Sequence, residues 1–188
     1  MTEDITGKRI AFLLTDGVEE VELTSPWQAV KDAGGIPVLV SPKPDTVTAN
    51  NHDTEAGGSY PVDVRVSIAN AEEYDSLVLP GGVVNADSLR TDKDSVAFTK
   101  AFFEAGKPVA AICHAAWILI EAAVVEGREL TSYPSLATDL RNAGARWVDE
   151  EVVVDNGLTT SRSPADLPAF NAKLVEETWE GKHSGQTA

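Results

Sequence analysis

Short aliphatic segments alternate along the chain with stretches that have a helical pattern, and this alternation restricts the possible folds more than any other feature. The aliphatic segments are typical of strands buried on both faces of a parallel sheet. They cover residues 9–14, 36–40, 76–79 and 109–112, and the helical patterns cover 23–33, 94–105, 115–123, 134–143 and 166–179. This order predicts an open α/β sheet with helices on both sides.

Three stretches depart from the alternation. Residues 42–60 are rich in Pro, Asn, Asp, Thr and Gly, which predicts a long surface excursion with a small hairpin. Residues 152–160 predict two strands joined by an Asn-Gly turn. The residues after Gly181 are polar and are expected to form a mobile tail. We therefore expect one domain over residues 1–188, with its core at about 8–179 and a polar tail at 181–188.

Composition limits the cellular setting. A chain of 188 residues with 43% hydrophobic residues can bury a sizeable core in one domain. No apolar run reaches membrane-spanning length, and the first residues lack a secretory pattern. The single cysteine permits no internal disulfide, so we expect a reduced, cytoplasmic protein.

The net charge of the chain is −15, from 30 acidic and 15 basic residues. Phosphate backbones would be repelled by this charge, and no basic stripe reverses it locally. The sequence therefore predicts neither a nucleic-acid partner nor a membrane partner. Three scattered histidines and one cysteine give no metal-ligand spacing, so metal catalysis is not expected, and no cofactor motif is found.

The single cysteine, Cys113, lies where an aliphatic segment meets a helical pattern. A residue at such a turn is exposed at the rim of the sheet, and the N–H groups of the first helical turn point toward it. Those groups favour the thiolate, so Cys113 is expected to have a low pKa. A buried structural cysteine is the alternative, because free cysteine is among the most buried residue types.

Three glutamates open the helical pattern after the first aliphatic segment. Acidic residues in a first turn interact well with the helix dipole, which is a sufficient role for Glu20. Glu19 and Glu22 are three positions apart and share a helix face. A carboxyl group near a thiolate would stay protonated and could act as general acid or base, which is the role we favour for Glu22.

Four motifs resemble those of the PfpI intracellular-protease family, in the family's order. Residues 111–114, AICH, resemble its A-I-C-H-G-P motif, and residues 77–82, LVLPGG, resemble its L-V-L-P-G-G turn. Residues 16–23, DGVEEVEL, resemble its acidic turn, and residues 160–170, TSRSPADLPAF, resemble its closing segment. The family belongs to the class I glutamine amidotransferase-like superfamily, with the Parkinson-disease-associated deglycase. The resemblance implies a single-domain flavodoxin-like, three-layer sandwich with a mostly parallel sheet and a nucleophile elbow.

The resemblance also implies site residues. It assigns the nucleophile to Cys113, the carboxylate that contacts it to Glu22, and an oxyanion hole to the backbone N–H groups of Gly82 and His114. His114 is the candidate base, although adjacent side chains at a sharp turn need not face each other. The remaining pocket candidates are Glu19, Gly81, Tyr133 and Trp117. Structural ion pairing is the favoured role of Arg162.

The chain departs from the family at two places. Ala115-Ala116 replaces the usual Gly-Pro after Cys-His, which adds a methyl group at the elbow and restores a backbone N–H that proline lacks. Proteolytic members are thought to borrow a glutamate from a neighbouring subunit, and the matching position here is Ala86. Alanine cannot orient a histidine, so a Cys-His-acid triad would be incomplete.

These residues and the family resemblance imply three alternative functions. The first is a cofactor-independent stress-protection enzyme of glyoxalase or deglycase type, in which Cys113 and Glu22 convert a small reactive carbonyl such as methylglyoxal to a hydroxy acid. The second is an intracellular cysteine peptidase acting on peptides. The third is a non-enzymatic stress protein in which Cys113 senses redox state. The resemblance also implies self-association as a dimer or larger homo-oligomer.

Overall fold

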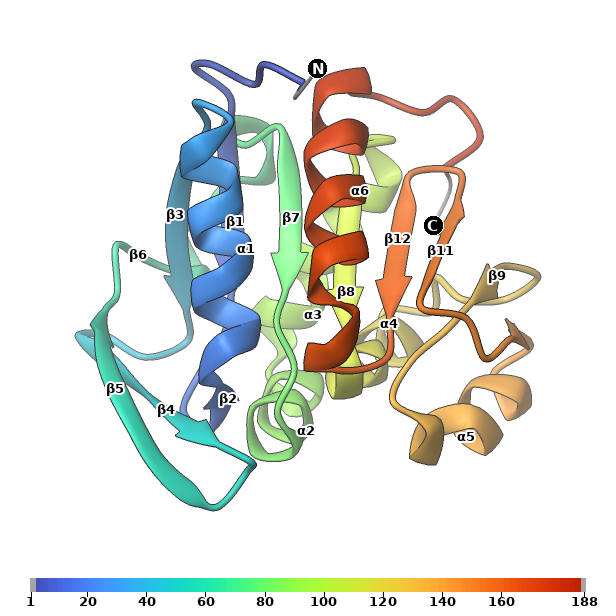
Figure 1. Ribbon diagram of the computed structural model, residues 1–188, viewed down its shortest axis with the longest axis horizontal. Helices are drawn as coiled ribbons and strands as arrows, with labels where there is room; N and C mark the ends of the chain where they lie inside the picture. The colour runs from blue at the N-terminus through green and yellow to red at the C-terminus, as the bar shows by residue number, and fades with distance from the viewer. Residues whose placement is uncertain (1–2, 187–188) are drawn as a thin grey trace.

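A central seven-stranded sheet lies between two layers of helices in the computed structural model, which describes residues 3–186 (Figure 1). The strand order is β11-β12-β8-β7-β1-β3-β6, and every neighbouring pair is parallel except β11 with β12. The strands are β1 (Arg9–Leu13), β3 (Ile36–Ser41), β6 (Val64–Arg65), β7 (Ser76–Leu79), β8 (Val109–Ile112), β11 (Val152–Asp155) and β12 (Leu158–Ser161). The predicted mostly parallel, flavodoxin-like α/β fold is confirmed.

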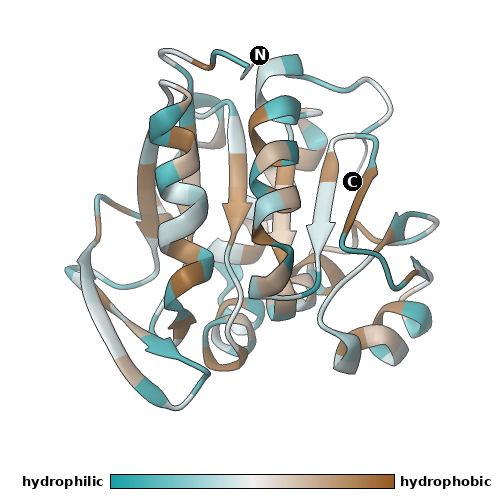
Figure 2. Ribbon diagram, viewed as in Figure 1, coloured by the Kyte–Doolittle hydropathy of each residue, from teal (hydrophilic) through white to brown (hydrophobic). Residues whose placement is uncertain are grey.

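The two faces of the sheet are covered by different helices. Helices α1 (Glu20–Asp32) and α6 (Leu167–Glu180) cover one face, and α2 (Val83–Thr91), α3 (Lys93–Glu104) and α4 (Ala116–Glu121) lie on the other (Figure 1). Because strand side chains alternate, Ile10 and Phe12 pack toward α1 and α6, whereas Ala11 and Leu13 join the core under α3 and α4. In Figure 2, β3, β11 and much of β7 are brown, whereas α1 and α6 alternate teal with white and brown, as expected of helices with one buried and one exposed side.

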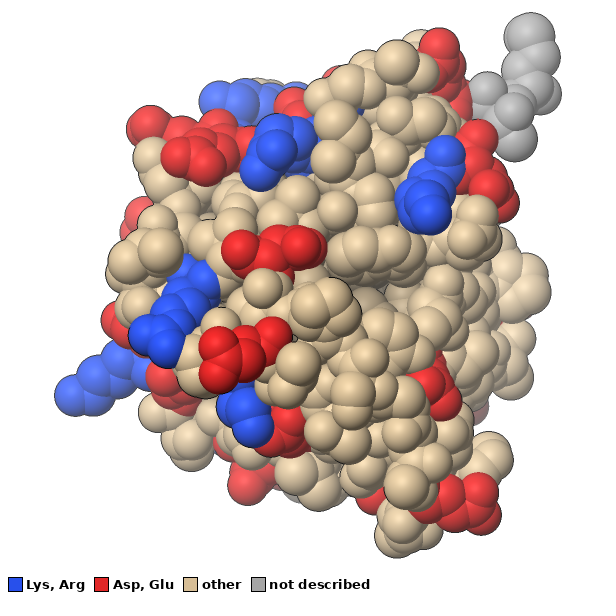
Figure 3. Space-filling view, turned by 90° about the vertical axis from the view of Figure 1, so that its left-hand side faces the viewer, with Lys and Arg blue, Asp and Glu red and all other residues tan. Residues whose placement is uncertain are grey.

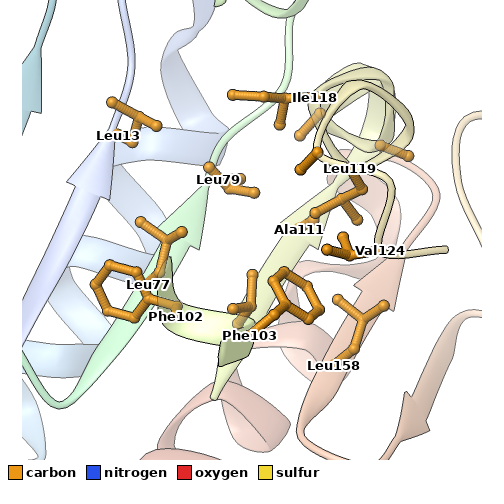
Figure 4. Close-up of a cluster of buried hydrophobic side chains, with 14 of the residues drawn as sticks. Leu13, Leu77, Leu79, Phe102, Phe103, Ala111, Ile118, Leu119, Val124 and Leu158 are labelled. Atoms are coloured by element: carbon orange, nitrogen blue, oxygen red, sulfur yellow. The ribbon is translucent and has the colours of Figure 1, made fainter. Parts of the chain in front are cut away.

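Two fully buried phenylalanines of α3 lie in the core between α3, α4 and the sheet. Phe102 and Phe103 of α3 are fully buried and meet strand residues Leu77 and Leu158 (Figure 4). Leu119 of α4 packs into the same cluster. This packing fixes α4 against the sheet, and with it the turn that precedes α4.

Two small sheets extend from the central layers. Strand β2 (Val18–Glu19) pairs with the hairpin of β4 (Thr46–Asn51) and β5 (Glu55–Pro61), which confirms a hairpin in the polar excursion. Strands β9 (Glu129–Leu130) and β10 (Arg146–Trp147) pair beside α5 (Ala137–Asn142). The predicted Asn-Gly turn is also confirmed, because Asn156 and Gly157 have φ of 49° and 84° between β11 and β12.

The structure differs from the expected elements in several places: the short strands β6, β9 and β10 were not expected, and the helix expected over 134–143 is a 3₁₀ turn followed by α5. Helix α2 was not anticipated, because its residues have no clear apolar stripe. Of the helix expected over 115–123, only α4 (Ala116–Glu121) is α-helical, and a 3₁₀ turn over Cys113–Ala115 precedes it. The tail is not free as far as Gln186: the backbone N–H of His183 donates to Gly106 O, and Gln186 is buried. Residues 187–188 lie outside the described part.

The surface agrees with the acidic composition. On the face shown in Figure 3, basic side chains lie singly among acidic ones and do not gather into a patch. Among the described residues, no helix is long and apolar enough to cross a membrane.

Candidate active site

The backbone turns sharply at Cys113, directly after β8. Cys113 has a φ of +62°, a left-handed conformation that is uncommon outside glycine. This strain is retained because Ile112 before it and Ala115 and Ala116 after it are buried in the two cores. The turn lifts the thiol above the carboxyl end of the sheet, where open α/β proteins bind ligands.

Glu22 lies fully buried in the first turns of α1, on the side that faces the elbow. Its Oε2 accepts a hydrogen bond of 2.8 Å from the backbone N–H of Gly81, and its carboxyl group interacts with the Cys113 thiol. Burial raises the pKa of Glu22 to about 8, and the nearby charge of Glu19 adds to the effect. Glu22 Oε1 has no hydrogen-bond partner among the described atoms, so it is the oxygen free to hold or transfer a proton.

Gly81 and Gly82 bring the backbone close to this pair. A Cβ on Gly81 would lie 2.4 Å from Glu22 Oε2 and 2.7 Å from Cys113 Cβ. Gly82 has a φ of +88°, and a Cβ there would lie 2.4 Å from the carbonyl oxygen of Gly17. No other residue type fits either position without moving the site.

The thiol does not have the low pKa expected from the sequence. Burial raises the pKa of Cys113, and the charge of an ionised Glu22 raises it further. Hydrogen bonds from the backbone N–H groups of Gly82 and His114 act in the opposite direction without prevailing. The expectation is wrong because Cys113 is only 7% exposed and opens a 3₁₀ turn, so the N-terminus of α4 lies three residues beyond it.

The His114 side chain does reach its neighbour. The His114 Nδ1 atom lies 3.2 Å from Cys113 Sγ, and Nε2 lies 3.4 Å from the Ser135 hydroxyl. The ring stacks on Tyr133 with centroids 4.6 Å apart. Burial lowers the pKa of His114, so the imidazole is neutral at pH 7. With its proton on Nε2 toward Ser135, His114 can accept the thiol proton at Nδ1.

The tip of the β4–β5 hairpin reaches the site, which the sequence did not indicate. The Glu19 carboxylate accepts hydrogen bonds from the backbone N–H groups of His52 and Asp53, at 3.1 and 3.3 Å. Asp53 Oδ1 in turn accepts from the N–H of Val83, at 2.9 Å, at the start of α2. His52 and Asp53 both have positive φ, which forms the tight turn at the tip; the polar composition of the segment does not show where that turn falls. Glu19 therefore holds the tip of the β4–β5 hairpin against the start of α1.

A cavity of about 430 Å³ opens above Cys113 between these elements. Trp117 is not at its wall: it packs behind His114, and its Nε1 donates to Asp139. Ser135 beside His114 and the lining residues His52, Asp53, Val83 and Pro164 were not expected from the sequence. The cavity is lined by Glu19, Glu22, His52, Asp53, Gly82, Val83, Cys113, His114, Tyr133 and Pro164.

The remaining candidates have structural positions. Arg162 pairs with Asp166 and Asp149, at 2.9 and 2.8 Å, so the predicted structural pairing is confirmed. Ala86 is 1% exposed within α2, and Asp87 beside it is exposed. A buried alanine offers no acid to a histidine of this chain or of another copy.

A flavodoxin-like sheet with a buried cysteine at a nucleophile elbow and a protonated glutamate beside it defines the class of cysteine-centred α/β proteins. Within that class, this chain belongs to the DJ-1/PfpI family, whose profile matches residues 8–177. The family resemblance noted from the four motifs is thereby confirmed.

Named relatives cover nearly the whole domain. Protein/nucleic acid deglycase 2 of Escherichia coli is 44% identical over 169 residues, 89% of this chain and 96% of its own. General stress protein 18 of Bacillus subtilis is 44% identical over 171 residues, 90% of this chain and 96% of its own. A solved two-domain protein of Anabaena variabilis, with DJ-1/ThiJ/PfpI-like and ferritin-like domains, matches with a TM-score of 0.84 and 33% identity, over 90% of this chain and 49% of its own.

Proposed function

We propose that this protein is a cofactor-independent enzyme of glyoxalase or deglycase type that converts small reactive dicarbonyls such as methylglyoxal to hydroxy acids. The observation that carries the proposal is the buried Cys113–Glu22 pair, with the pKa of Glu22 raised to about 8. A general base with a pKa close to the working pH is the group that a carbon-to-carbon proton transfer needs. The deglycase name of the Escherichia coli relative supports the same class of chemistry.

The first step is addition of sulfur to the aldehyde carbon. The thiol proton passes to His114 Nδ1 while the sulfur–carbon bond forms, which removes the need for a preformed thiolate. The backbone N–H groups of Gly82 and His114 donate to the sulfur of the resting thiol; as the sulfur–carbon bond forms, they become free to donate to the negative oxygen that develops beside it. His114 returns the proton to that oxygen, and the product is a hemithioacetal.

The second step moves a proton between the two carbonyl carbons. The ionised form of Glu22 removes the proton from the carbon bound to sulfur, giving an enediolate. It then delivers that proton to the neighbouring carbon, while the hydroxyl proton of the first carbon moves to the second oxygen. The product is a thioester of a 2-hydroxy acid. The free Oε1 of Glu22 is the atom suited to both transfers.

The third step is hydrolysis. Glu22 takes a proton from water as the oxygen adds to the thioester carbon, the carbon–sulfur bond breaks, and Glu22 returns the proton to sulfur. The sum is the addition of one water to the dicarbonyl, and both side chains end in their starting states.

Turnover of methylglyoxal, measured as lactate formed, tests this function. The intact protein should form lactate over many cycles, and Cys113→Ala should form none. Trp117→Phe is the matched control behind the site and should retain turnover. Absence of lactate from the intact protein at every pH between 6 and 9 would refute the proposal.

A redox-sensing function is the second candidate, and one observation favours it. The N–H groups of Gly82 and His114 and a protonated Glu22 surround the sulfur, and these donors would stabilise a sulfinate formed by peroxide. A mass gain of two oxygens on Cys113 at low peroxide, together with no lactate formation, would support this function in place of the enzymatic one.

A further inference from the structure

A cluster of metal-ligand side chains lies at the far end of α6, outside the cavity described above. Glu177 and Glu180 belong to the last turns of the helix, and His183 belongs to the segment that follows it. One ligand atom from each lies within 4.8 Å of the other two. The family profile ends at residue 177, so most of the cluster lies beyond the family's shared domain.

The buried member of the cluster is incompletely satisfied. Glu177 is only 6% exposed, and its Oε2 makes no hydrogen bond of ordinary geometry within the described residues. That oxygen lies 3.0 Å from His183 Nε2, which is also buried without a hydrogen bond. The contact is an ion pair only when His183 is protonated; with a neutral imidazole, a buried oxygen and a buried ring nitrogen face each other, which is costly unless a cation bridges them.

Two lysines near the cluster are already engaged. Lys8 Nζ donates to the carbonyl oxygens of Thr178 and Trp179, and Lys173 Nζ pairs with Glu176 at 2.7 Å. The Gln186 side chain is buried beside the imidazole, and neither its oxygen nor its nitrogen has a hydrogen-bond partner in the described part of the chain. A Cβ on Gly157 would lie 2.2 Å from Gln186 Oε1 and 2.8 Å from His183 Cδ2, so both side chains crowd the same point.

We propose that Glu177, Glu180 and His183 form a binding site for a divalent transition-metal cation of the zinc type, which fastens the C-terminal segment to α6. Two ligands about 2.1 Å from a tetrahedral zinc ion are about 3.4 Å apart, which is close to the Glu177–His183 separation. Two carboxylates and one imidazole suit zinc and its neighbours better than calcium, which takes oxygen ligands only. The fourth position is left for water or for the Gln186 amide oxygen.

The inferred role is structural. The segment is held by the hydrogen bond of 2.8 Å from His183 N to Gly106 O and by the turn bond from Gln186 N to His183 O. A metal ion would add a link between this segment and α6, because His183 lies in the segment and both glutamates lie on the helix. The acidic net charge of −15 favours the approach of a cation.

Zinc titration by calorimetry tests the site. The protein is full-length Cys113→Ala, freed of metal by a chelator, so that zinc cannot report on the cavity thiol. We expect one equivalent of Zn²⁺ to bind, and Glu180→Gln to weaken binding by more than the ~10-fold that loss of an outer-shell partner costs. His183→Ala should abolish it. Glu180 is exposed, so its replacement should not disturb folding.

Two matched variants and a second measurement complete the test. Glu176→Gln removes a neighbouring charge on the same helix and His52→Ala removes a histidine elsewhere, and both should bind zinc as the parent does. The thermal midpoint should rise with zinc concentration in the parent and not in His183→Ala. No binding, binding unchanged by Glu180→Gln and His183→Ala, or equal weakening by the two control variants would overturn the site.

Discussion

The backbone N–H of Gly81 donates a hydrogen bond of 2.8 Å to the Glu22 carboxylate, and no side chain fits between the two residues. The bond fixes one oxygen of Glu22 and leaves the other free beside the thiol. Helix α1 and the turn after β7 are thereby joined at the reacting centre, although the two residues are 59 positions apart in sequence.

Gly81→Ala should greatly reduce dicarbonyl turnover while the protein still folds. The added Cβ would lie 2.4 Å from Glu22 Oε2 and 2.7 Å from Cys113 Cβ, so the pair must separate. We expect turnover to fall by about 10²-fold or more, as for other small displacements of reacting groups. Lactate formation and circular dichroism, measured together, check this. Gly127→Ala is the control: nothing lies within 4 Å of its added Cβ, and its φ of +75° strains the backbone only, so it should lose stability and keep turnover. Wild-type turnover by Gly81→Ala would show that the close approach is unimportant.

Glu22→Gln should damage catalysis far more than stability. The amide keeps the size of the side chain and can still accept from Gly81, but it cannot exchange a proton. The acid–base steps should therefore slow by about 10²–10⁴-fold. In the parent protein, turnover should rise with pH toward the Glu22 pKa of about 8, because the ionised form is the base. Glu19→Gln makes the same change of side chain at the same end of α1 and should lose much less. An equal loss in both variants would mean that Glu22 is not the proton-transfer residue.

The dependence of stability on pH should also report Glu22. Its pKa is about 8 when folded and is near 4.5 in a free side chain, so folding takes up a proton between these values. Its stabilising contribution is complete below pH 4.5 and is lost as pH rises to 8, at about 1.4 kcal/mol per pH unit. Glu22→Gln does not titrate, so its advantage over the parent in free energy of unfolding should grow across this window. Denaturant unfolding at pH 5, 6, 7 and 8 measures it, and a constant difference would contradict the raised pKa.

Cys113 should react slowly with iodoacetamide at neutral pH and faster as the pH becomes alkaline. Burial and the Glu22 charge hold the thiol pKa above its usual range, so the thiolate fraction grows only above that range. Glu22→Gln removes the charge and should move the labelling curve to lower pH. Mass spectrometry of the alkylated protein follows the reaction, and the denatured chain gives the unperturbed curve. Full thiolate reactivity of the folded protein at pH 6 would favour the original sequence-based expectation.

Peptidase activity should be weak or absent. Ala86 occupies the position of the acidic partner and is buried, so His114 receives no carboxylate there. Ser135 is the group at its far nitrogen, and a hydroxyl orients the ring without stabilising an imidazolium as a carboxylate does. Fluorogenic peptides and casein are suitable substrates. Efficient cleavage that disappears in Cys113→Ala would show that the triad is completed in another way.

The main strands and the Asn-Gly turn could be predicted from the sequence, because each depends on the residues within it. The aliphatic segments match β1, β3, β7 and β8, and the Asn156-Gly157 turn matches its hairpin. Strand burial and turn conformation follow from side-chain type and from the backbone freedom of asparagine and glycine. The motif around Cys113 located the elbow for the same reason, since a strand pattern meets a helical one there.

The tertiary structure alone decided the properties of the site. The pKa of Cys113 was predicted to be low and is raised, because its value depends on burial and on Glu22, which is brought beside it from another helix. The tip of the β4–β5 hairpin is held at the cavity by hydrogen bonds between residues distant in sequence, from His52 and Asp53 to Glu19 and from Val83 to Asp53. Sequence therefore determined which elements form and which residues can react. The pKa of a side chain depends on all the charges and burial around it, and most of those neighbours are distant in sequence. Only the folded chain therefore fixed the pKa of Cys113 and the position of the hairpin tip.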